Sequence, residues 1–401
     1  MRIGVFTNTF MPALNGVAKS IEMFRRGLTA LGHDVFVITA AVPRPGDVPD
    51  YVVQCRACPA GRHNDYAIAL PYSLPEARVD ALELDIIHSH HVIWVGRWGL
   101  LYGRRHGLPV VATVHTHFDS CLPYVPVIRS LARPLLRRAY RRLCNECDIV
   151  IAPTATRAQQ LREIAVNAPI EVVPNGVDLA EFQALDRERW RTRWGLRPTE
   201  VAIGYIGRLG PEKRCDVLLR AFARCARDLD VRLILVGNGP SQPAMQRLAR
   251  AMHLGDRVVF QGPVPHEAIP SCHAALDIFA HASPLETMPM SILEAMAAGT
   301  VVAALDVPGP RDIIQSGRTG MLAPNDEAAF ADLLRTLIVS PPLRARLARA
   351  ARAEVGSFDH VQSGARLLEV YRCAVATRLE GSGEPAVSYV YGAGSGSWPQ
   401  R

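Results

Sequence analysis

Short apolar segments alternate with helix-like stretches along almost the whole chain, and the alternation runs through twice. The segments are rich in Val and Ile, which is typical of strands buried on both faces of a parallel sheet. Strands that alternate with helices predict a doubly wound α/β fold. The expected strands lie at 3–7, 35–39, 86–88, 110–114 and 149–152, and then at 201–206, 231–236, 258–261, 278–281 and 301–304.

A turn-rich stretch, Pro-Asn-Gly-Val-Asp at 174–178, interrupts the alternation and is followed by charged residues up to about Pro198. This interruption predicts two α/β domains, 1–175 and 176–356, with a cleft between their sheets. An amphipathic pattern from Asp359 to about Thr377 predicts a C-terminal helix, which we assign to 357–380. The Gly- and Ser-rich end, 381–401, is expected to be a flexible tail.

The composition limits the class of protein. Of the 401 residues, 49% are apolar and 21% are charged, a balance typical of a globular chain. No apolar run approaches the ~20 residues that span a bilayer. The first apolar residues turn polar at Thr7-Asn8-Thr9, too early for the core of a signal peptide. We therefore expect a cytoplasmic protein, and the nine scattered cysteines are expected to be free thiols.

Two cations follow the strand expected at 201–206. Arg208 and Lys213 lie in the segment Gly-Arg-Leu-Gly-Pro-Glu-Lys, at the end of the strand where ligands of doubly wound sheets bind. Two positive charges flanked by glycines suit a diphosphate, although a solvated basic loop is the alternative. Gly16 follows the first strand just before a helix, where a backbone N–H can approach a phosphate. A simple turn glycine would also explain Gly16.

Glu286 and Glu294 are eight residues apart, around the start of a helix expected near Met288 and Pro289. Carboxylates accept hydrogen bonds from sugar hydroxyls, and the free N–H groups of a helix start hold anions. Small apolar residues surround both glutamates, so we expect burial, and buried carboxylates need partners. Ordinary surface charge is the alternative.

Together these pieces resemble the retaining glycosyltransferases of family 4, which have the GT-B fold of two Rossmann-like domains. The resemblance covers nearly the whole chain. It is carried by the first strand with its glycine loop, by 174–178, by Gly-Arg-Leu…Glu-Lys at 207–213, by Gly-Asn-Gly-Pro at 237–240 and by Glu-x7-Glu at 286–294. Phe-Met-Pro-Ala-Leu-Asn-Gly-Val at 10–17 and Thr-Val-His-Thr-His at 113–117 look most like the branch that glycosylates lipids such as diacylglycerol or phosphatidylinositol.

The resemblance implies a role for each of these residues. Arg208 and Lys213 would neutralise the diphosphate of a nucleotide-sugar donor, and the backbone of Gly16 would close over it. Glu294 would hold the ribose, and Glu286 would hold the hydroxyls of the donor sugar. His115 matches the family histidine that faces this sugar from the first domain. The resemblance also implies that the helix at 357–380 crosses back to the first domain.

The loop before Glu294 departs from the family pattern. The resemblance implies that backbone N–H groups around Met288–Met290 would serve the sugar and the phosphate, but many members have Phe-Gly where this chain has Met288-Pro289. Proline has no N–H, so we expect one backbone contact of this loop to be absent or shifted.

No metal and no cofactor are expected. The Asp-x-Asp pattern at 228–230 precedes its strand, at the wrong end for the cleft, so we interpret it as surface. Cys55 with Cys58, and Cys144 with Cys147, could be halves of a zinc site, but buried thiols are the preferred interpretation. The histidines at 88, 90 and 91 could bind a metal, although we prefer a role in lining the cleft.

The segment 129–142 carries six arginines and no acidic residue, with leucines and Tyr140 as an apolar side. Together with the net charge of +7, it indicates an acidic partner. A basic amphipathic stretch suits anionic lipid headgroups, and a solvated helix packed on its own domain is the alternative. Nucleic acid fits less well, because no zinc-finger or RNP pattern is present. The predicted membrane-binding residues are Arg129, Arg133, Arg137, Arg138, Arg141 and Arg142.

The sequence thus predicts an enzyme at the inner face of the membrane that moves a hexose, with retention, to a hydroxyl of a membrane lipid. UDP-glucose and GDP-mannose are the expected donors. Two alternatives stay open. The same chemistry could act on a soluble or polysaccharide acceptor, or the chain could be a non-catalytic binder of sugar nucleotides or polyanions.

Overall fold

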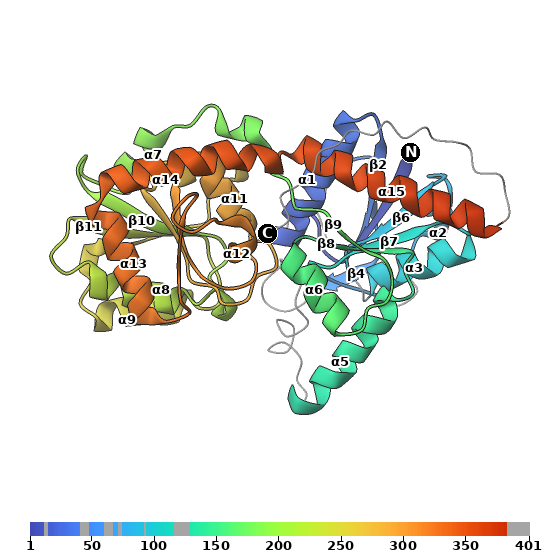
Figure 1. Cartoon of the computed structure of the whole chain (residues 1–401), viewed down its shortest axis with the longest axis horizontal. Coiled ribbons are helices and arrows are strands. Elements are labelled where there is room, and N and C mark those ends of the chain that lie inside the picture. The colour runs from blue at the N-terminus through green and yellow to red at the C-terminus, as the bar shows by residue number, and fades with distance from the viewer. Residues whose placement is uncertain are drawn as a thin grey trace.

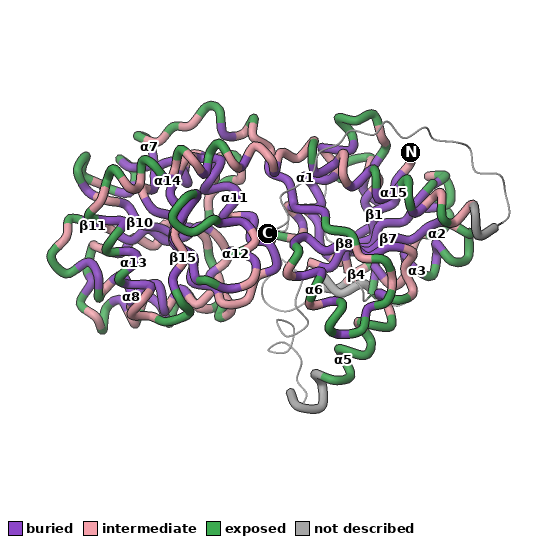
Figure 2. Tube along the Cα trace, viewed as in Figure 1, coloured by how far each residue is buried: buried purple, intermediate pink, exposed green. Residues whose placement is uncertain are grey.

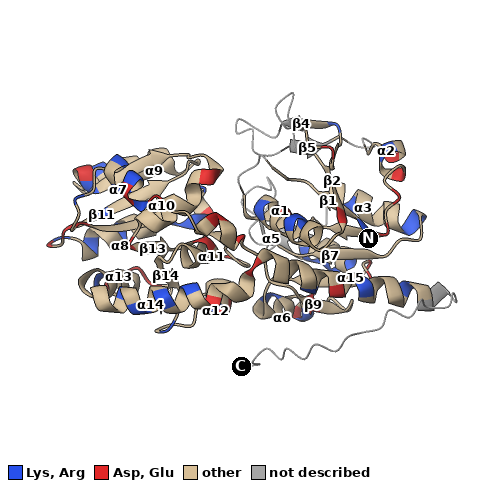
Figure 3. Cartoon of the chain, turned by 90° about the horizontal axis from the view of Figure 1, so that it is seen from above, with Lys and Arg blue, Asp and Glu red and all other residues tan. Residues whose placement is uncertain are grey.

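Two parallel sheets, one in each half of the chain, form the centre of the protein (Figure 1). The computed structural model describes residues 1–11, 15–40, 48–59, 67–70, 74–91, 94–115 and 129–382. The strands are buried in the middle of each half (Figure 2), and the charged residues gather on the helices and loops around them (Figure 3). The predicted doubly wound α/β architecture is therefore confirmed.

The first sheet has seven strands in the order β3-β2-β1-β6-β7-β8-β9, and all neighbours run parallel. Because β2 and β6 lie on opposite sides of β1, the strand order reverses there, and ligands of such sheets bind at the reversal point. The strands are β1 Arg2–Thr7, β2 Asp34–Thr39, β3 Val52–Gln54, β6 Ile86–Ser89, β7 Val110–Thr113, β8 Ile149–Ala152 and β9 Ile170–Val172. The helices are α1 Gly16–Ala30, α2 Glu76–Asp80, α3 Val95–Arg105, α5 Arg129–Cys144 and α6 Ala155–Glu163, and β4 Ala57–Pro59 pairs separately with β5 Ala67–Ala69.

The second sheet has six parallel strands in the order β12-β11-β10-β13-β14-β15. Its order reverses at β10, as the order of the first sheet does at β1. The strands are β10 Val201–Ile206, β11 Val231–Val236, β12 Val258–Gly262, β13 Ile278–His281, β14 Val301–Leu305 and β15 Met321–Ala323. The helices are α7 Arg187–Arg193, α8 Cys215–Cys225, α9 Gln242–Ala251, α10 Ile269–Ala275, α11 Met290–Ala297, α12 Pro310–Ile313, α13 Glu327–Val339 and α14 Pro341–Glu354. The 3₁₀ turns include η2 Leu179–Phe182 and η3 Pro211–Lys213.

All ten predicted strands are present, with ends shifted by at most one residue. The strands that were not predicted are the three-residue edge strands β3, β9 and β15 and the separate pair of β4 and β5. Runs this short bury too few apolar side chains to produce a detectable pattern.

The chain passes between the two halves at two adjacent places. Val173 packs in a core cluster of the first half and Val177 in the core of the second. The returning chain runs beside this crossing, because the Val177 N–H donates to the Phe358 carbonyl (2.8 Å) and the His360 N–H donates to the Val177 carbonyl (3.1 Å). The two crossings therefore form one hydrogen-bonded connection.

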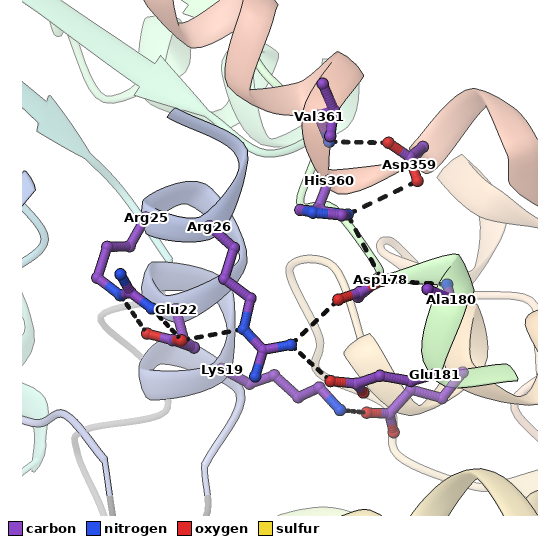
Figure 4. A network of polar contacts seen from close by, with 11 residues as sticks. Lys19, Glu22, Arg25, Arg26, Asp178, Ala180, Glu181, Asp359, His360 and Val361 are labelled. Atoms are coloured by element: carbon purple, nitrogen blue, oxygen red, sulfur yellow. Dashed lines mark hydrogen bonds and ion pairs between the residues drawn. The ribbon is translucent and has the colours of Figure 1, made fainter. Parts of the chain in front are cut away.

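Charged side chains brace this connection (Figure 4). Arg26 of α1 pairs with Asp178 (3.1 Å) and with Glu181 of η2 (2.7 Å), and it also contacts Glu22 one turn earlier (3.0 Å). Arg26 thus ties the first helix to the segment that enters the second half.

The last helix, α15 (His360–Ser382), lies against the first half, where Leu367 and Tyr371 are fully buried in the core. It packs on α1 at two glycines, because a Cβ on Gly27 would collide with the His360 carbonyl and one on Gly364 would lie 2.9 Å from the Gly27 carbonyl carbon. The predicted C-terminal helix, assigned to 357–380, is present as α15, which begins at His360 and ends at Ser382. Residues 383–401 of the expected tail lie outside the described residues.

The charged segment before Pro198 is a packed part of the second half. Trp190 and Trp194 of this segment are buried in the core of that half. Arg191, also buried, donates to Asp277 (3.1 Å) and to the Glu200 carbonyl (2.7 Å). The charges of this segment were recognised in the sequence. That its two tryptophans pack in the core of the second half was not predicted.

Candidate functional site

Most of the predicted site residues follow strands at or near the reversal points of the two sheets. Gly16 begins α1 after β1, His115 follows β7, Arg208 and Lys213 follow β10, Glu286 follows β13, and Glu294 lies in α11. Helices α1 and α11 contact each other, so loops from the two halves converge there.

Lys213 and Glu286 form an ion pair in the second half. Lys213 Nζ donates to Glu286 Oε1 at 2.6 Å, and His281 Nε2 lies 3.5 Å from the same oxygen. Burial would raise the pKa of Glu286, but the charge of Lys213 and the hydrogen bond from His281 lower it well below its ordinary value. Burial lowers the pKa of Lys213, but the charge of Glu286, its hydrogen bond with Lys213 and the charge of Glu212 together raise this pKa above its ordinary value. Both groups are therefore charged at neutral pH.

Arg208 has a carboxylate partner within its own loop. Its guanidinium donates to Glu212 at 2.5 Å, and Ser283 Oγ donates to the Glu212 carbonyl at 3.1 Å. The two cations of this loop were predicted as site residues, and Glu212 was not. Both cations are placed by carboxylates, so an incoming diphosphate would compete with these partners.

Glu294 is paired across the two halves. Lys19 of α1 donates to its Oε1, and His273 Nε2 lies 3.4 Å from its Oε2 (Lys19 is labelled in Figure 4). Burial would raise the pKa of Glu294, but the charge of Lys19, with the His273 ring close by, holds this pKa well below its ordinary value. Neither Lys19 nor His273 was predicted as part of the site.

The loop at 288–290 is clamped by the chain crossing. The backbone N–H of Asn175 donates to Met288 Sδ (3.2 Å), and the side-chain amide of Asn175 donates to the Met288 carbonyl (3.4 Å). Ser20 Oγ in turn donates to the side-chain oxygen of Asn175 (2.7 Å). Helix α11 begins at Met290, with Pro289 at its N-cap and no capping side chain. The start of α11 thus lies against both halves, and Pro289 contributes no N–H to it.

Gly16 is the exposed first residue of α1. The Asn15 side chain caps this helix by accepting from the Ala18 N–H (2.9 Å). A Cβ on Gly16 would meet no atom within 4 Å, so the space beside the helix start is open. An open helix N-terminus at the reversal point is compatible with an anion there.

His115 contacts a second histidine, because His115 Nε2 lies 2.7 Å from His90 Nδ1. The expected cleft-lining role of the neighbouring histidines is wrong for His88, which is fully buried between Thr113 Oγ1 (2.7 Å) and the Tyr371 hydroxyl (2.6 Å). His88 connects the first sheet to α15, and this contact brings together residues 283 positions apart.

Helix α5 extends away from the rest of the molecule (Figure 1) and is largely exposed (Figure 2). Leu135 is 68% exposed, so an apolar side chain accompanies the charges. Arg137 donates to the Glu163 carbonyl (3.2 Å) and Arg142 pairs with Glu146 (3.0 Å). The exposed arginines are Arg137, Arg138, Arg141 and Arg142, and the side chains of Arg129 and Arg133 lie outside the described residues.

None of the helices in the described part of the chain has the length and apolar character needed to span a bilayer. No three His, Cys, Asp or Glu side chains among the described residues converge on one point where a metal could bind. Asp228 and Asp230 are exposed at the start of β11, and Cys55, Cys144 and Cys147 are free thiols. Burial raises the pKa of Cys55 and of Cys144 to about 12.

Two family models match this chain. A family model described as "Glycosyltransferase Family 4" matches residues 14–181, and one described as "Glycosyl transferases group 1" matches residues 186–354. D-inositol 3-phosphate glycosyltransferase 1 from Catenulispora acidiphila is 31% identical over 381 residues, which cover 88% of this chain and 90% of the relative. Alpha-monoglucosyldiacylglycerol synthase from Streptococcus pneumoniae is 26% identical over 383 residues, which cover 94% of this chain and 86% of the relative.

A solved structure has the same fold. Sucrose-phosphate synthase from Thermosynechococcus elongatus aligns with a TM-score of 0.79 at 21% identity, and the alignment covers 94% of this chain and 99% of the other. At this identity the similarity establishes the arrangement of the two sheets and leaves the substrates open.

Proposed function

Because the chain belongs to glycosyltransferase family 4, we propose that it transfers a hexose from a nucleotide sugar to a hydroxyl group of a membrane lipid. The chain is a retaining GT-B enzyme, as its motifs indicated. UDP-glucose and GDP-mannose remain the expected donors. The exposed arginines of helix α5 are the observation that favours a lipid acceptor.

The diphosphate would lie between Gly16, Arg208 and Lys213. Negative charge grows on the leaving nucleoside diphosphate as the glycosidic bond breaks, so fixed cations stabilise the transition state more than the ground state. Lys213 and Arg208 are held in place by Glu286 and Glu212 until the phosphates compete for them. Glu294 would accept hydrogen bonds from the ribose.

The sugar would lie between Glu286, His115 and the start of α11. A carboxylate and backbone groups at 288–290 would bind its hydroxyls, and nearby oxygens favour the positive charge of an oxocarbenium-like transition state. Glu286 is engaged by Lys213 and His281, which makes it a poor nucleophile in this arrangement. We therefore favour attack by the acceptor on the same face that the leaving group departs from, with a donor phosphate oxygen taking the acceptor proton.

Helix α5, which extends away from the rest of the molecule, carries exposed arginines and an exposed leucine. Basic residues near an anionic surface contribute about 1 kcal/mol each, and an apolar residue adds insertion into the headgroup region. This combination suits an enzyme that works at the inner membrane face on a lipid acceptor. The similarity to alpha-monoglucosyldiacylglycerol synthase from Streptococcus pneumoniae, whose name is that of a glycolipid synthase, supports a lipid acceptor.

The test is a transfer assay with radiolabelled UDP-glucose and GDP-mannose, each offered to diacylglycerol in anionic vesicles, phosphatidylinositol in anionic vesicles, or soluble inositol 3-phosphate. We expect one donor to label a lipid. Labelling of inositol 3-phosphate alone would move the assignment to a soluble acceptor, in line with the Catenulispora relative. Binding of the donor with neither sugar transfer nor donor hydrolysis would favour the non-catalytic alternative.

A further inference from the structure

Three histidines are packed together beside the candidate site. His90 Nδ1 lies 2.7 Å from His115 Nε2, and their rings are stacked, with centroids 5.0 Å apart and planes inclined by 14°. The His88 ring also packs on His90, with centroids 4.0 Å apart. His115 is the partly exposed member of the group, whereas His88 and His90 are 0% and 3% exposed.

The surroundings hold His90 in one orientation. His88 is fixed through both ring nitrogens by Thr113 and Tyr371, so it forms a rigid support for the His90 ring. The backbone N–H of His90 donates to the Phe6 carbonyl at 3.0 Å, and this hydrogen bond anchors the backbone of His90 to β1. In this arrangement the ring of His90 presents Nδ1 to His115.

Both rings are neutral at physiological pH. Burial, together with the neighbouring histidines, lowers the pKa of His90 and that of His115 well below 6.5. A neutral imidazole carries one N–H and one lone pair. The hydrogen bond between the two rings therefore has only two arrangements, in which either His90 or His115 donates.

The surroundings of the second ring nitrogen of His90, Nε2, indicate which of the two rings donates. His90 Nε2 is buried and has no hydrogen-bond partner among the described residues. If His115 donated, the proton of His90 would sit on Nε2 as a buried N–H without an acceptor, at a cost of about 1–3 kcal/mol. If His90 donates, Nε2 carries only a lone pair, and buried acceptors without partners are more common than buried donors without partners.

We propose that His90 is a positioning residue that fixes His115 in the tautomer with its proton on Nδ1. His115 then offers an N–H to a ligand and has no lone pair left with which to accept a proton. Such a group binds a sugar hydroxyl oxygen or a phosphate oxygen and does not act as a general base. The inference rests on the proposed function only for its kinetic consequence.

The direct test is ¹⁵N NMR of wild-type protein labelled at histidine, recorded at pH 7 without ligand, with His115→Gln used only to assign the signals. We expect His115 to carry its proton on Nδ1 and His90 to carry its proton on Nδ1 as well. A proton on Nε2 of His115, or a charged His115 ring, would overturn the proposal. This measurement does not depend on any substrate.

Two variants of His90 test the direction of the hydrogen bond. In His90→Asn an amide NH₂ stands near the former Nδ1 and can donate, whereas in His90→Asp a carboxylate can only accept. We expect His90→Asn to keep the His115 tautomer and to stay within about threefold of wild-type kcat. We expect His90→Asp to move the His115 proton to Nε2 and to lower kcat at least about tenfold, with donor KM changed little. The reverse ranking would overturn the proposal.

Thermal unfolding checks that both variants are folded. If His90→Asp does not fold, His90→Leu replaces it, because leucine removes the donor without adding a charge. In that variant a His115 tautomer and a kcat like those of the wild type would also contradict the proposal. A wild-type protein without transferase activity would refute the proposed function, and the NMR test of the tautomer would still decide this inference.

Discussion

Lys19, in the first helix of the chain, donates to Glu294, which lies 275 residues later in the second half. The two side chains are only 14% and 8% exposed, so the pair is largely shielded from water. It joins α1, whose N-terminus carries Gly16, to the carboxylate proposed to hold the ribose. A bound nucleoside would compete with Lys19 for this carboxylate, and the released ammonium group would lie one turn of helix from the proposed phosphate position.

Removing Lys19 should destabilise the protein in a pH-dependent way. Lys19→Met leaves the buried Glu294 carboxylate without its cation, which we expect to cost about 3 kcal/mol at pH 7. The pKa of Glu294 is depressed in the folded state, so its contribution is complete above the ordinary carboxyl pKa of about 4.3 and is lost as the pH falls further. Urea unfolding at pH 7 and at pH 3.5 measures the difference, and Lys19→Arg is the control that keeps the charge. An equal loss at both pH values would contradict the pairing.

Glu294 and Lys213 should affect different steps. Glu294→Ala removes the proposed ribose ligand, so we expect binding of UDP or GDP to weaken at least about tenfold. Lys213→Ala removes a cation that acts on the leaving group, so we expect kcat to fall by about 10² or more with a smaller change in binding. Calorimetry with the nucleotides and initial rates with the preferred donor check the two expectations. Wild-type behaviour of both variants would remove these residues from the site.

The exposed arginines of α5 should control vesicle binding alone. We expect replacement of Arg137, Arg138, Arg141 and Arg142 by Gln to reduce flotation with anionic vesicles at least about tenfold, and to leave UDP and GDP binding unchanged. The matched control replaces four exposed arginines of α9 and α14, namely Arg250, Arg346, Arg349 and Arg352. If both variants lose flotation equally, net charge explains the effect. Unchanged flotation of the α5 variant would mean that the helix only packs on its own domain.

Turnover should not require a divalent metal. The proposed site neutralises the diphosphate with Arg208 and Lys213, so we expect EDTA to leave kcat and the thermal stabilisation by nucleotide unchanged. A loss of activity that Mg²⁺ or Mn²⁺ restores would show that a metal carries part of this charge.

The glycine contact between α1 and α15 should tolerate no side chain. A methyl group on Gly27 would collide with the His360 carbonyl, and such overpacking costs about 1–3 kcal/mol. We expect Gly27→Ala to lower the free energy of unfolding by this amount in chemical denaturation. Gly356→Ala, where a Cβ meets no atom within 4 Å, is the control that should change it little. Similar values for both variants would mean that α15 shifts without strain.

The sequence predicted the central strands well because their signal is local. A segment such as β8 (Ile149–Ala152) is buried at every position, and its β-branched residues mark it without help from the rest of the chain. The loop residues after the strands were found for the same reason, since their positions follow from the strands.

The partners of the site residues could not be found in this way. Lys19 and Glu294 are 275 residues apart, and His88 and Tyr371 are 283 residues apart. Nothing in the composition around Lys19 distinguishes it from other lysines and arginines on helix surfaces. Which charge meets which depends on how the two sheets are arranged, and that arrangement is set by packing over the whole chain.

The position of α15 has a consequence for how the protein is made. The core of the first half includes Leu367 and Tyr371, so the sheet that is synthesised first lacks part of its packing until the final helix leaves the ribosome. Throughout synthesis of the second half, the surface of α1 that receives α15 stays uncovered. Folding of the first half on the ribosome is therefore expected to remain incomplete until α15 has emerged, packed over His88 and closed the first domain.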